Sequence, residues 1–326
     1  MLKDAVRTDA YRDFIYNNKN LFKDKVVLDI GCGTGILSMF CAKAGAKQVI
    51  AVDKSDIMTK AMENIFNNGL QGKITCIKGA MEEVVLPVDQ VDIIVSEWMG
   101  YFLLYEAMLP SVLYARDKYL KPGGLMVPSA MTMWVAPVAD EEFVADHVSF
   151  WRDVYGFDMK AMQEGIYEEA RVEVMPEKSI CGKPFPFKGL DLYKVTKEDL
   201  SFSVKWKSAL KRDIDQLDGL LIWFDNFFDV DAGASLPALE TTTDAFIKQK
   251  NGNVAFSTGP FKTPTHWKQG FLLITPDAAH QHLPQSTILE GDLTYAVLAD
   301  NDRALLIDSS WGREGAEQKK QSWKMK

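Results

Sequence analysis

The sequence of 326 residues predicts an α/β domain that is followed by a β-rich domain. Two observations support this division. In the first hundred residues, short runs rich in Val and Ile alternate with segments whose apolar residues have helical spacing. From about residue 130, apolar runs follow one another with turn residues between them. We place the boundary at Pro128, so that the domains are 1–128 and 129–326.

Four apolar runs are the strand candidates of the first domain, at 25–30, 47–53, 73–79 and 91–97. Between them, segments such as "ILSMFCAKAGA" and "DIMTKAMENIFNNG" have apolar residues at helical spacing and Gly at their ends. The strand candidates do not alternate with polar residues, which is typical of strands buried on both faces. We therefore expect a parallel sheet that is covered by helices on both faces.

The second domain contains strand candidates separated by turn residues. Three of its segments carry further expectations: 140–165 should be helical, 229–253 should be a long loop, and the tail 314–326 should fray. The strand candidates are "MTMWVAPV", "LSFSVKWKSAL", "GLLIWFDNFFDV", "WKQGFLLIT" and "LTYAVLA".

Charge is distributed unevenly along the chain. Residues 1–128 hold 15 basic and 15 acidic residues, whereas the rest hold 22 and 30, so the second domain carries the whole net charge of −8. An acidic domain disfavours nucleic acid and suits a basic partner. No apolar run approaches the ~20 residues that span a bilayer. Four scattered cysteines without a CxxC pair indicate a reducing compartment and no metal site.

A glycine-rich turn, "VLDIGCGTG", follows the first strand candidate and precedes a helix. Gly31, Gly33 and Gly35 allow the backbone to turn sharply and to approach a ligand closely. Their spacing is GxGxG, whereas a dinucleotide-binding loop has GxGxxG. Asp29, directly before the loop, would repel a pyrophosphate and would suit an amino group.

Acidic residues also follow the next two strand candidates. Asp53 ends the second strand, where a carboxylate can accept hydrogen bonds from ribose hydroxyls. Glu82 follows the third strand and could accept a hydrogen bond from an adenine amino group. These residues favour a nucleoside that carries an amino-acid tail and no phosphate, which is S-adenosylmethionine. The alternative is that the glycines form a purely structural turn.

The stretch "SEWMGYFLLYEAM" (96–108) places Glu97 and Glu106 in apolar surroundings with no Lys or Arg between them. Carboxylates are rarely buried without a partner, so either they lie on the surface or they await a cation that the protein does not supply. Glu97 follows the fourth strand, at the edge where ligands bind in open α/β sheets. Two convergent carboxylates suit a guanidinium. They would draw its charge toward the nitrogens that they contact and leave a terminal nitrogen freer to attack a methyl group.

These motifs resemble those of the protein arginine methyltransferases. "SEWMGYFLLYEAM" resembles their double-glutamate hairpin, "THWKQ" (265–269) their Thr-His-Trp loop, and "MLKDAVRTDAYR" their first cofactor helix. "WRDVYGFDM" (151–159) resembles their dimerisation arm, and the glycine loop resembles their cofactor loop. The match covers nearly the whole chain, in order. It is closest to the cytosolic, ribosome-associated type I subgroup, and it covers the catalytic core without that subgroup's zinc finger.

The resemblance implies a fold and an activity. The fold would be a class I, Rossmann-like methyltransferase domain followed by a β-barrel substrate-binding domain, with 140–165 as an inserted helical dimerisation arm of a homodimer. The enzyme would transfer methyl groups from S-adenosylmethionine to terminal guanidino nitrogens of protein arginines. The products would be mono- and asymmetric dimethylarginine and S-adenosylhomocysteine. The expected substrates are Gly/Arg-rich or ribosomal proteins, and the expected compartment is the cytoplasm, with the nucleus as the second choice.

The resemblance also implies roles for residues at the reacting end of the site. Glu97 and Glu106 would clamp the substrate arginine. His266 would lie near them, paired with Asp4, as a base or an orienting group. Ala107 stands where the family usually has Ser.

Two further residues would contact the cofactor. Arg7 would pair with its carboxylate, and Met108 would pack near its methyl group and favour asymmetric dimethylation. The family also places an aromatic-bearing helix before the segment that matches Met1 onward, and the sequence begins inside that region.

Three other interpretations share some of these features. A methyltransferase for a small amine or phenol would use the same glycine loop but needs no paired carboxylates. A binding module could keep the fold as a scaffold, against which Glu97, Glu106 and His266 argue. A nicotinamide dehydrogenase is disfavoured by the glycine spacing and by Asp29.

Overall fold

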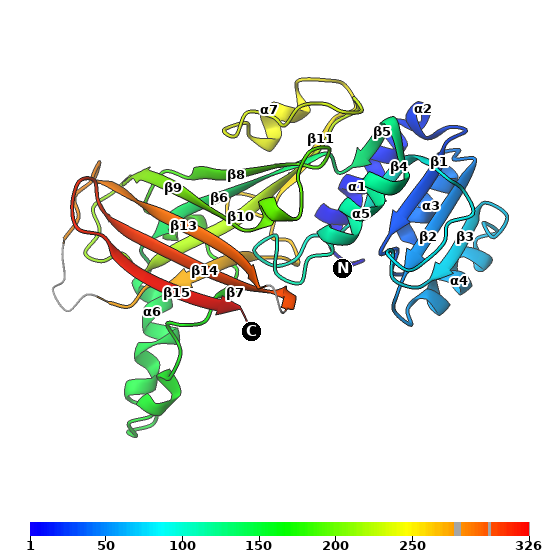
Figure 1. Ribbon diagram of the computed structural model, residues 1–326. Helices are drawn as coiled ribbons and strands as arrows, with labels where there is room; N and C mark the ends of the chain where they lie inside the picture. The colour runs from blue at the N-terminus through cyan, green and yellow to red at the C-terminus, as the bar shows by residue number, and fades with distance from the viewer. Residues whose placement is uncertain (277–281, 299–300, 326) are drawn as a thin grey trace.

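The computed structural model describes residues 1–276, 282–298 and 301–325. An α/β domain and a β-rich domain lie side by side, and a segment that begins with α6 (Glu141–His147) projects from the β-rich domain (Figure 1). None of the described helices is both long enough and apolar enough to cross a membrane.

The first domain is built on a five-stranded parallel sheet with the order β3-β2-β1-β4-β5. The four predicted strands are present. A fifth strand was missed because "KPGG", two Gly after a Pro, is typical of a turn. The strands are β1 (Val26–Ile30), β2 (Gln48–Asp53), β3 (Ile74–Lys78), β4 (Val91–Ser96) and β5 (Leu120–Val127).

The helices of this domain begin where local chemistry favours them. The side chain of Asp4 caps the first helix by accepting a hydrogen bond from the Arg7 N–H. Gly35, at φ +83°, precedes α3 in a left-handed conformation that glycine adopts without strain. The helices are α1 (Ala5–Asn17), α2 (Lys19–Phe22), α3 (Ile36–Lys43), α4 (Met58–Asn67) and α5 (Leu109–Tyr119).

The strand order reverses between β1 and β4. Ile30 and Ser96 are partners in the parallel register, and the Ser96 hydroxyl donates to the Ile30 carbonyl at 2.8 Å. The loops that follow these two strands therefore leave the sheet next to each other. Open α/β sheets bind ligands at such a switch point, beyond the carboxyl ends of the strands.

The second domain consists of two antiparallel sheets that pack into a barrel-like body (Figure 1). Phe224, Tyr295 and Trp323 are buried in the core that the sheets share. The first sheet contains β6 (Ala130–Val138), β7 (Arg171–Glu173), β8 (Phe185–Asp191), β10 (Gly219–Phe228), β11 (Val254–Ser257) and β12 (Gln269–Leu273). The second contains β9 (Phe202–Ala209), β13 (Ile288–Leu298), β14 (Asn301–Arg313) and β15 (Lys319–Met325).

Three expectations for the second domain need correction. The segment 140–165 is helical only in α6 and in two 3-10 turns, η1 (Ser149–Arg152) and η2 (Lys160–Gln163). The segment 229–253 is not only a loop, because it contains α7 (Thr243–Ile247), whose Phe246 packs on Phe227 of β10. The tail does not fray through its described part, since β15 pairs with β14 along its length. Two short 3-10 turns complete the domain, η3 (Glu177–Ser179) and η4 (Glu198–Leu200).

Helix α1 connects the two domains. The Tyr11 hydroxyl donates to the Ser96 carbonyl at 2.9 Å, and the same ring packs edge-on against Phe228 of β10 at 4.9 Å. At the end of the helix, Asn18 donates to the Gly252 carbonyl of the second domain at 2.8 Å. The first helix thus holds the end of β4 against the barrel.

Candidate active site

The glycine loop forms a close-packed cradle at the end of β1. Gly31, Gly33 and Gly35 all have positive φ, at 69°, 54° and 83°. A Cβ on Gly31 would lie 2.3 Å from the Met108 Cε, so no other residue fits there without a shift of Met108. The Gly33 N–H donates to Asp53 at 2.9 Å, which ties the loop to the end of β2. Met108 therefore lies against the glycine loop, and its expected position near the methyl group of the cofactor stays a prediction.

Asp29 lies beneath the loop and not at its surface. It is fully buried, and its Oδ2 accepts a hydrogen bond from the Ser38 hydroxyl at 2.5 Å. Its Oδ1 has no partner among the described residues, and burial raises the pKa of the carboxyl to about 6. The expectation that Asp29 faces the ligand is therefore not met in this structure, where Asp29 supports the loop from below.

The other two acidic candidates of the cofactor site differ in their surroundings. Asp53, at the end of β2, accepts hydrogen bonds from the Gly33 N–H and from Ser55, and it is partly exposed. Glu82 lies in an exposed turn after β3, where its carbonyl accepts a hydrogen bond from the Tyr114 hydroxyl at 3.3 Å and no side chain of the described residues pairs with its carboxylate. Asp53 is thus part of the loop's own network, whereas the Glu82 carboxylate is not held in place.

Glu97 follows β4 directly and is almost completely buried. Arg7 of α1 donates from Nε and Nη2 to the same carboxylate oxygen, Oε2, at 3.2 and 2.9 Å. The two side chains are 7% and 3% exposed, for Arg7 and Glu97 respectively. Among the described residues no donor reaches Oε1, which leaves that oxygen for a further cation. Burial raises the pKa of Glu97, although the charge of Arg7 offsets part of this effect.

The carboxylate of Glu106 has a different environment. The side chain of Glu106 is 50% exposed, and its backbone has a φ of +55°. Arg303 of β14 forms an ion pair with it, in which Nη2 lies 3.4 Å from Oε1. No hydrogen bond or ion pair among the described residues joins Glu106 to Glu97. The expectation that the protein supplies no cation to these glutamates is wrong, because Arg7 and Arg303 supply one to each.

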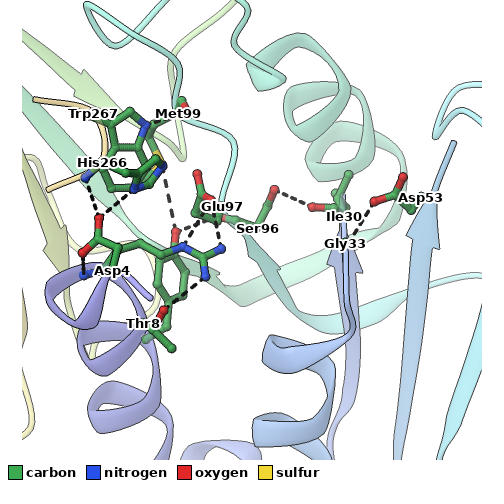
Figure 2. Close-up of polar contacts among 12 residues, drawn as sticks. Asp4, Thr8, Ile30, Gly33, Asp53, Ser96, Glu97, Met99, His266 and Trp267 are labelled. Atoms are coloured by element: carbon green, nitrogen blue, oxygen red, sulfur yellow. Dashed lines mark hydrogen bonds and ion pairs between the residues drawn. The ribbon is translucent and has the colours of Figure 1, made fainter. Parts of the chain in front are cut away.

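Asp4 and His266 contact each other close to the ion pair of Arg7 and Glu97 (Figure 2). Asp4 Oδ2 accepts from the backbone N–H of His266 at 2.8 Å and lies 2.7 Å from the ring Nδ1 (Figure 2). Burial alone would raise the pKa of Asp4, but the hydrogen bonds from His266 and from the Arg7 N–H lower it below its usual value. An ionised Asp4 can only accept a hydrogen bond, so the Nδ1–H of His266 donates to it. The other ring nitrogen, Nε2, is then the one that can exchange a proton with the substrate.

Several residues that position the site were not singled out in the sequence. The indole of Trp267 donates to the Met99 carbonyl at 3.0 Å and fixes the start of the hairpin on the barrel (Figure 2). Tyr11 fixes the point where the hairpin leaves β4, because its hydroxyl donates to the Ser96 carbonyl. Both lie within motifs that resemble the family, but their contacts join segments far apart in the sequence. Arg303 lies outside every quoted motif, so no sequence signal pointed to it.

The cradle and its surroundings fit a nucleoside with an amino-acid tail. The glycine loop allows close approach of a ligand, and Asp53 offers carboxylate acceptors at the end of β2. The contacts of Arg7 with Glu97 and Thr8 use three of its five N–H groups, so two can bind a carboxylate. Within the described parts of the chain, no cluster of three His, Cys, Asp or Glu side chains could hold a metal ion.

The parallel sheet, its glycine loop and the buried glutamate at the switch point define a methyltransferase. A general methyltransferase-domain model matches residues 27–124, and a model described as the arginine methyltransferase oligomerization subdomain matches residues 129–314. The chain belongs to the protein arginine methyltransferase family.

Individual relatives agree with this assignment. The chain is 42% identical over 97% of its length to the ribosomal protein arginine N-methyltransferase rmt3 of Schizosaccharomyces pombe, and it spans 55% of that protein. It is 43% identical over 95% of its length to protein arginine N-methyltransferase 1 of the same organism, and it spans 85% of it.

Solved structures of the family have the same fold. The Trypanosoma brucei PRMT1 enzyme–prozyme heterotetrameric complex with AdoHcy superposes with a TM-score of 0.86 at 35% identity, covering 100% of this chain and 96% of that one. Protein arginine methyltransferase 10 of Arabidopsis thaliana superposes with a TM-score of 0.81 at 28% identity, over 100% and 96% of the two chains. The predictions of a methyltransferase domain with a barrel, of S-adenosylmethionine as cofactor and of methyl transfer to protein arginines are confirmed.

Proposed function

We propose that this chain is a type I enzyme that forms asymmetric dimethylarginine, and that Glu97, Glu106, Asp4 and His266 carry out its reaction. The observation that carries this proposal is the pair of Glu97 and Arg7. A guanidinium already lies on one oxygen of this buried carboxylate, and the other oxygen, Oε1, has no donor among the described residues. A substrate arginine can use that second oxygen in the same geometry.

Each of these residues has a separate task. S-adenosylmethionine, when bound, supplies an electrophilic methyl group. Glu97 and Glu106 hold and orient the substrate guanidinium, and their charges draw positive charge toward the nitrogens that they contact. The charge of Arg7 offsets part of the rise in the pKa of Glu97 that burial causes. His266, oriented by Asp4 at Nδ1, receives at Nε2 the proton that the substrate nitrogen loses.

The packing of Met108 beside the glycine loop supports a type I product. Met108 lies so close to Gly31 that a single added methyl group would overlap it. We infer that Met108 restricts how a methylated arginine can lie in the site, so that the second methyl group goes to the same nitrogen as the first.

The proposed substrates are Gly/Arg-rich segments, including those of ribosomal proteins, and the proposed assembly is a homodimer in the cytoplasm. The acidic second domain supports a basic substrate. One relative is named a ribosomal protein arginine N-methyltransferase, and the matched subdomain is described as one of oligomerization. An imaging experiment with the tagged protein tests the compartment, and nuclear fluorescence alone would contradict it.

The test of this proposal is a methylation assay with product identification. The chain is incubated with S-adenosylmethionine and a Gly/Arg-rich peptide, the peptide is hydrolysed, and its methylarginines are separated. We expect asymmetric dimethylarginine from the wild type and, because the guanidinium loses its ionic partner, a loss of at least ~100-fold for Glu97→Gln. Symmetric dimethylarginine, or monomethylarginine alone, would refute the type I assignment.

A further inference from the structure

Arg303 brings a second guanidinium of the chain itself to the glutamate hairpin. Its Nη2 lies 3.4 Å from Oε1 of Glu106, and the side chains of Arg303 and Glu106 are 56% and 50% exposed. The pair of Arg7 and Glu97 is shorter, doubly hydrogen-bonded and buried. Of these two ion pairs, the exposed one is therefore the weaker and the easier to exchange.

The same residue also holds the backbone of the hairpin. The Glu106 N–H donates to the Arg303 carbonyl at 3.0 Å. Phe102, Leu103 and Glu106 have φ of 52°, 69° and 55°, which non-glycine residues rarely adopt. Strained backbone of this kind persists only where its surroundings hold it. The start of β14 thus fixes the position of Glu106 through the backbone, independently of the Arg303 side chain.

We propose that the Arg303 side chain occupies Glu106 in the free enzyme and that the guanidinium of the substrate displaces it. This inference rests on the proposed function, in which Glu106 binds the substrate arginine. Arg303 presents the same chemical group as the substrate, so the two compete for one carboxylate. Arg303 is a positioning residue that pairs with the charge of Glu106 and orients its carboxylate until the substrate binds. Substrate binding is weakened by the free energy that is needed to break this ion pair.

The matched variants separate this role from general effects. Arg303→Gln removes the competing charge and leaves the backbone hydrogen bond from Glu106 in place. Arg303→Lys keeps the charge. Arg313→Gln removes the same charge from the other end of β14, where the Arg313 guanidinium donates to the His282 carbonyl and is remote in sequence from the hairpin. Any change that Arg313→Gln also shows is an effect of net charge alone.

The experiment measures binding and turnover of a Gly/Arg-rich peptide for all four proteins. Binding is measured by titration calorimetry with S-adenosylhomocysteine present. We expect Arg303→Gln to lower both Kd and KM by about 1.5- to 5-fold, the range for an exposed ion pair, with a smaller change in kcat. Arg303→Lys and Arg313→Gln should stay near the wild-type values. Thermal unfolding of each variant checks that the fold is intact.

A Kd for Arg303→Gln that equals the wild-type value, or exceeds it, would overturn the proposal. A decrease of equal size for Arg313→Gln would do the same. Failure of the proposed function is a separate result, because Kd is measured without turnover. A wild type that binds the peptide but forms no asymmetric dimethylarginine refutes the type I proposal alone, and a wild type that binds no arginine peptide refutes both.

Discussion

Asp29 and Glu97 are both buried carboxylates near the switch point of the parallel sheet, yet they have opposite partners. Asp29 accepts from a neutral hydroxyl, that of Ser38, and one of its oxygens has no partner among the described residues. Glu97 receives two hydrogen bonds from a guanidinium. Burial raises the pKa of both carboxyls, but only Glu97 has a hydrogen-bonded charged partner that offsets part of the rise, so the ionisation of Asp29 is the less compensated of the two.

This difference predicts how the stability of the free chain depends on pH. The pKa of Asp29 is about 6 in the folded chain and near 3.8 when unfolded. The native state therefore keeps a proton that the unfolded chain loses, and the Asp29 contribution to stability falls as pH rises from about 4 to about 6. The full effect is roughly 3 kcal/mol or less. Asp29→Asn removes it.

The measurement is the melting temperature of wild type and Asp29→Asn at about pH 4.5 and about pH 7. Relative to wild type, the variant should gain stability between the lower and the higher pH. Asp89→Asn is the control, because Asp89 is exposed. An identical offset between Asp29→Asn and wild type at both pH values would show that Asp29 does not titrate in this range.

At the scale of single residues, the sequence predicts candidates better than it predicts their partners. The glycine loop, Glu97 and Glu106 stand out because each belongs to a short, local pattern. Arg7 lies 90 residues before Glu97, and Arg303 lies far beyond Glu106 in another domain. Such pairings depend on the tertiary fold, so the spacing of residues within a short motif does not predict them.

Elements differ in the same way. The strands β1, β2 and β4 were predicted because their burial on both faces produces unbroken apolar runs. The strand β3 was predicted from the same pattern, but it lies at the edge of the sheet and only Ile74 is buried in it. The strand β15 was missed because the end of the sequence was expected to fray. Its burial in fact alternates: Trp323 is fully buried between the exposed Ser322 and Lys324. That period-two pattern was present in "QSWKM" and would have predicted an edge strand.

The last strand should therefore contribute to stability. Trp323 packs in the shared core of the barrel, and its indole donates to the Leu273 carbonyl of β12 at 2.9 Å. We expect Trp323→Ala to lower the free energy of unfolding by about 3–5 kcal/mol, the usual range for a buried Trp. Thermal unfolding of this variant and of Lys324→Ala, whose side chain is exposed, provides the measurement. Equal melting temperatures for the two variants would mean that the tail frays after all.

At the scale of the whole molecule, the site depends on both domains. Glu97 directly follows β4 of the first domain, whereas His266 and Trp267 belong to the second. Helix α1 lies between them and contributes both Asp4, as its N-cap, and Arg7. The two-domain order could be predicted from the change in apolar pattern. Of the contacts between the domains, the pair of Asp4 and His266 was expected from the resemblance, but the contacts of Tyr11 and Asn18 were not, because they involve single side chains on or next to α1.

In the arm, residues 140–165, Val148 is the one buried residue and several aromatic side chains are exposed. Tyr155 is 97% exposed and Phe157 is 70% exposed, and both lie beyond α6 on the segment that projects from the barrel (Figure 1). Apolar side chains gathered on one projecting segment mark an interaction surface. In the proposed homodimer, this surface is buried against the second copy.

The double substitution Tyr155→Ser and Phe157→Ser should therefore yield a monomer at micromolar concentration without loss of the fold. Each side chain makes few contacts within its own chain, so thermal unfolding should stay near wild type while the mass from sedimentation halves. The methylation rate should also fall if contact with the second copy helps to hold the active site in place. Val85→Ser, at an 87% exposed position in the segment before β4, removes an exposed apolar side chain elsewhere and should leave the dimer intact. A wild type that is already monomeric at this concentration would contradict the homodimer, and a dimeric double variant would place the interface outside the arm.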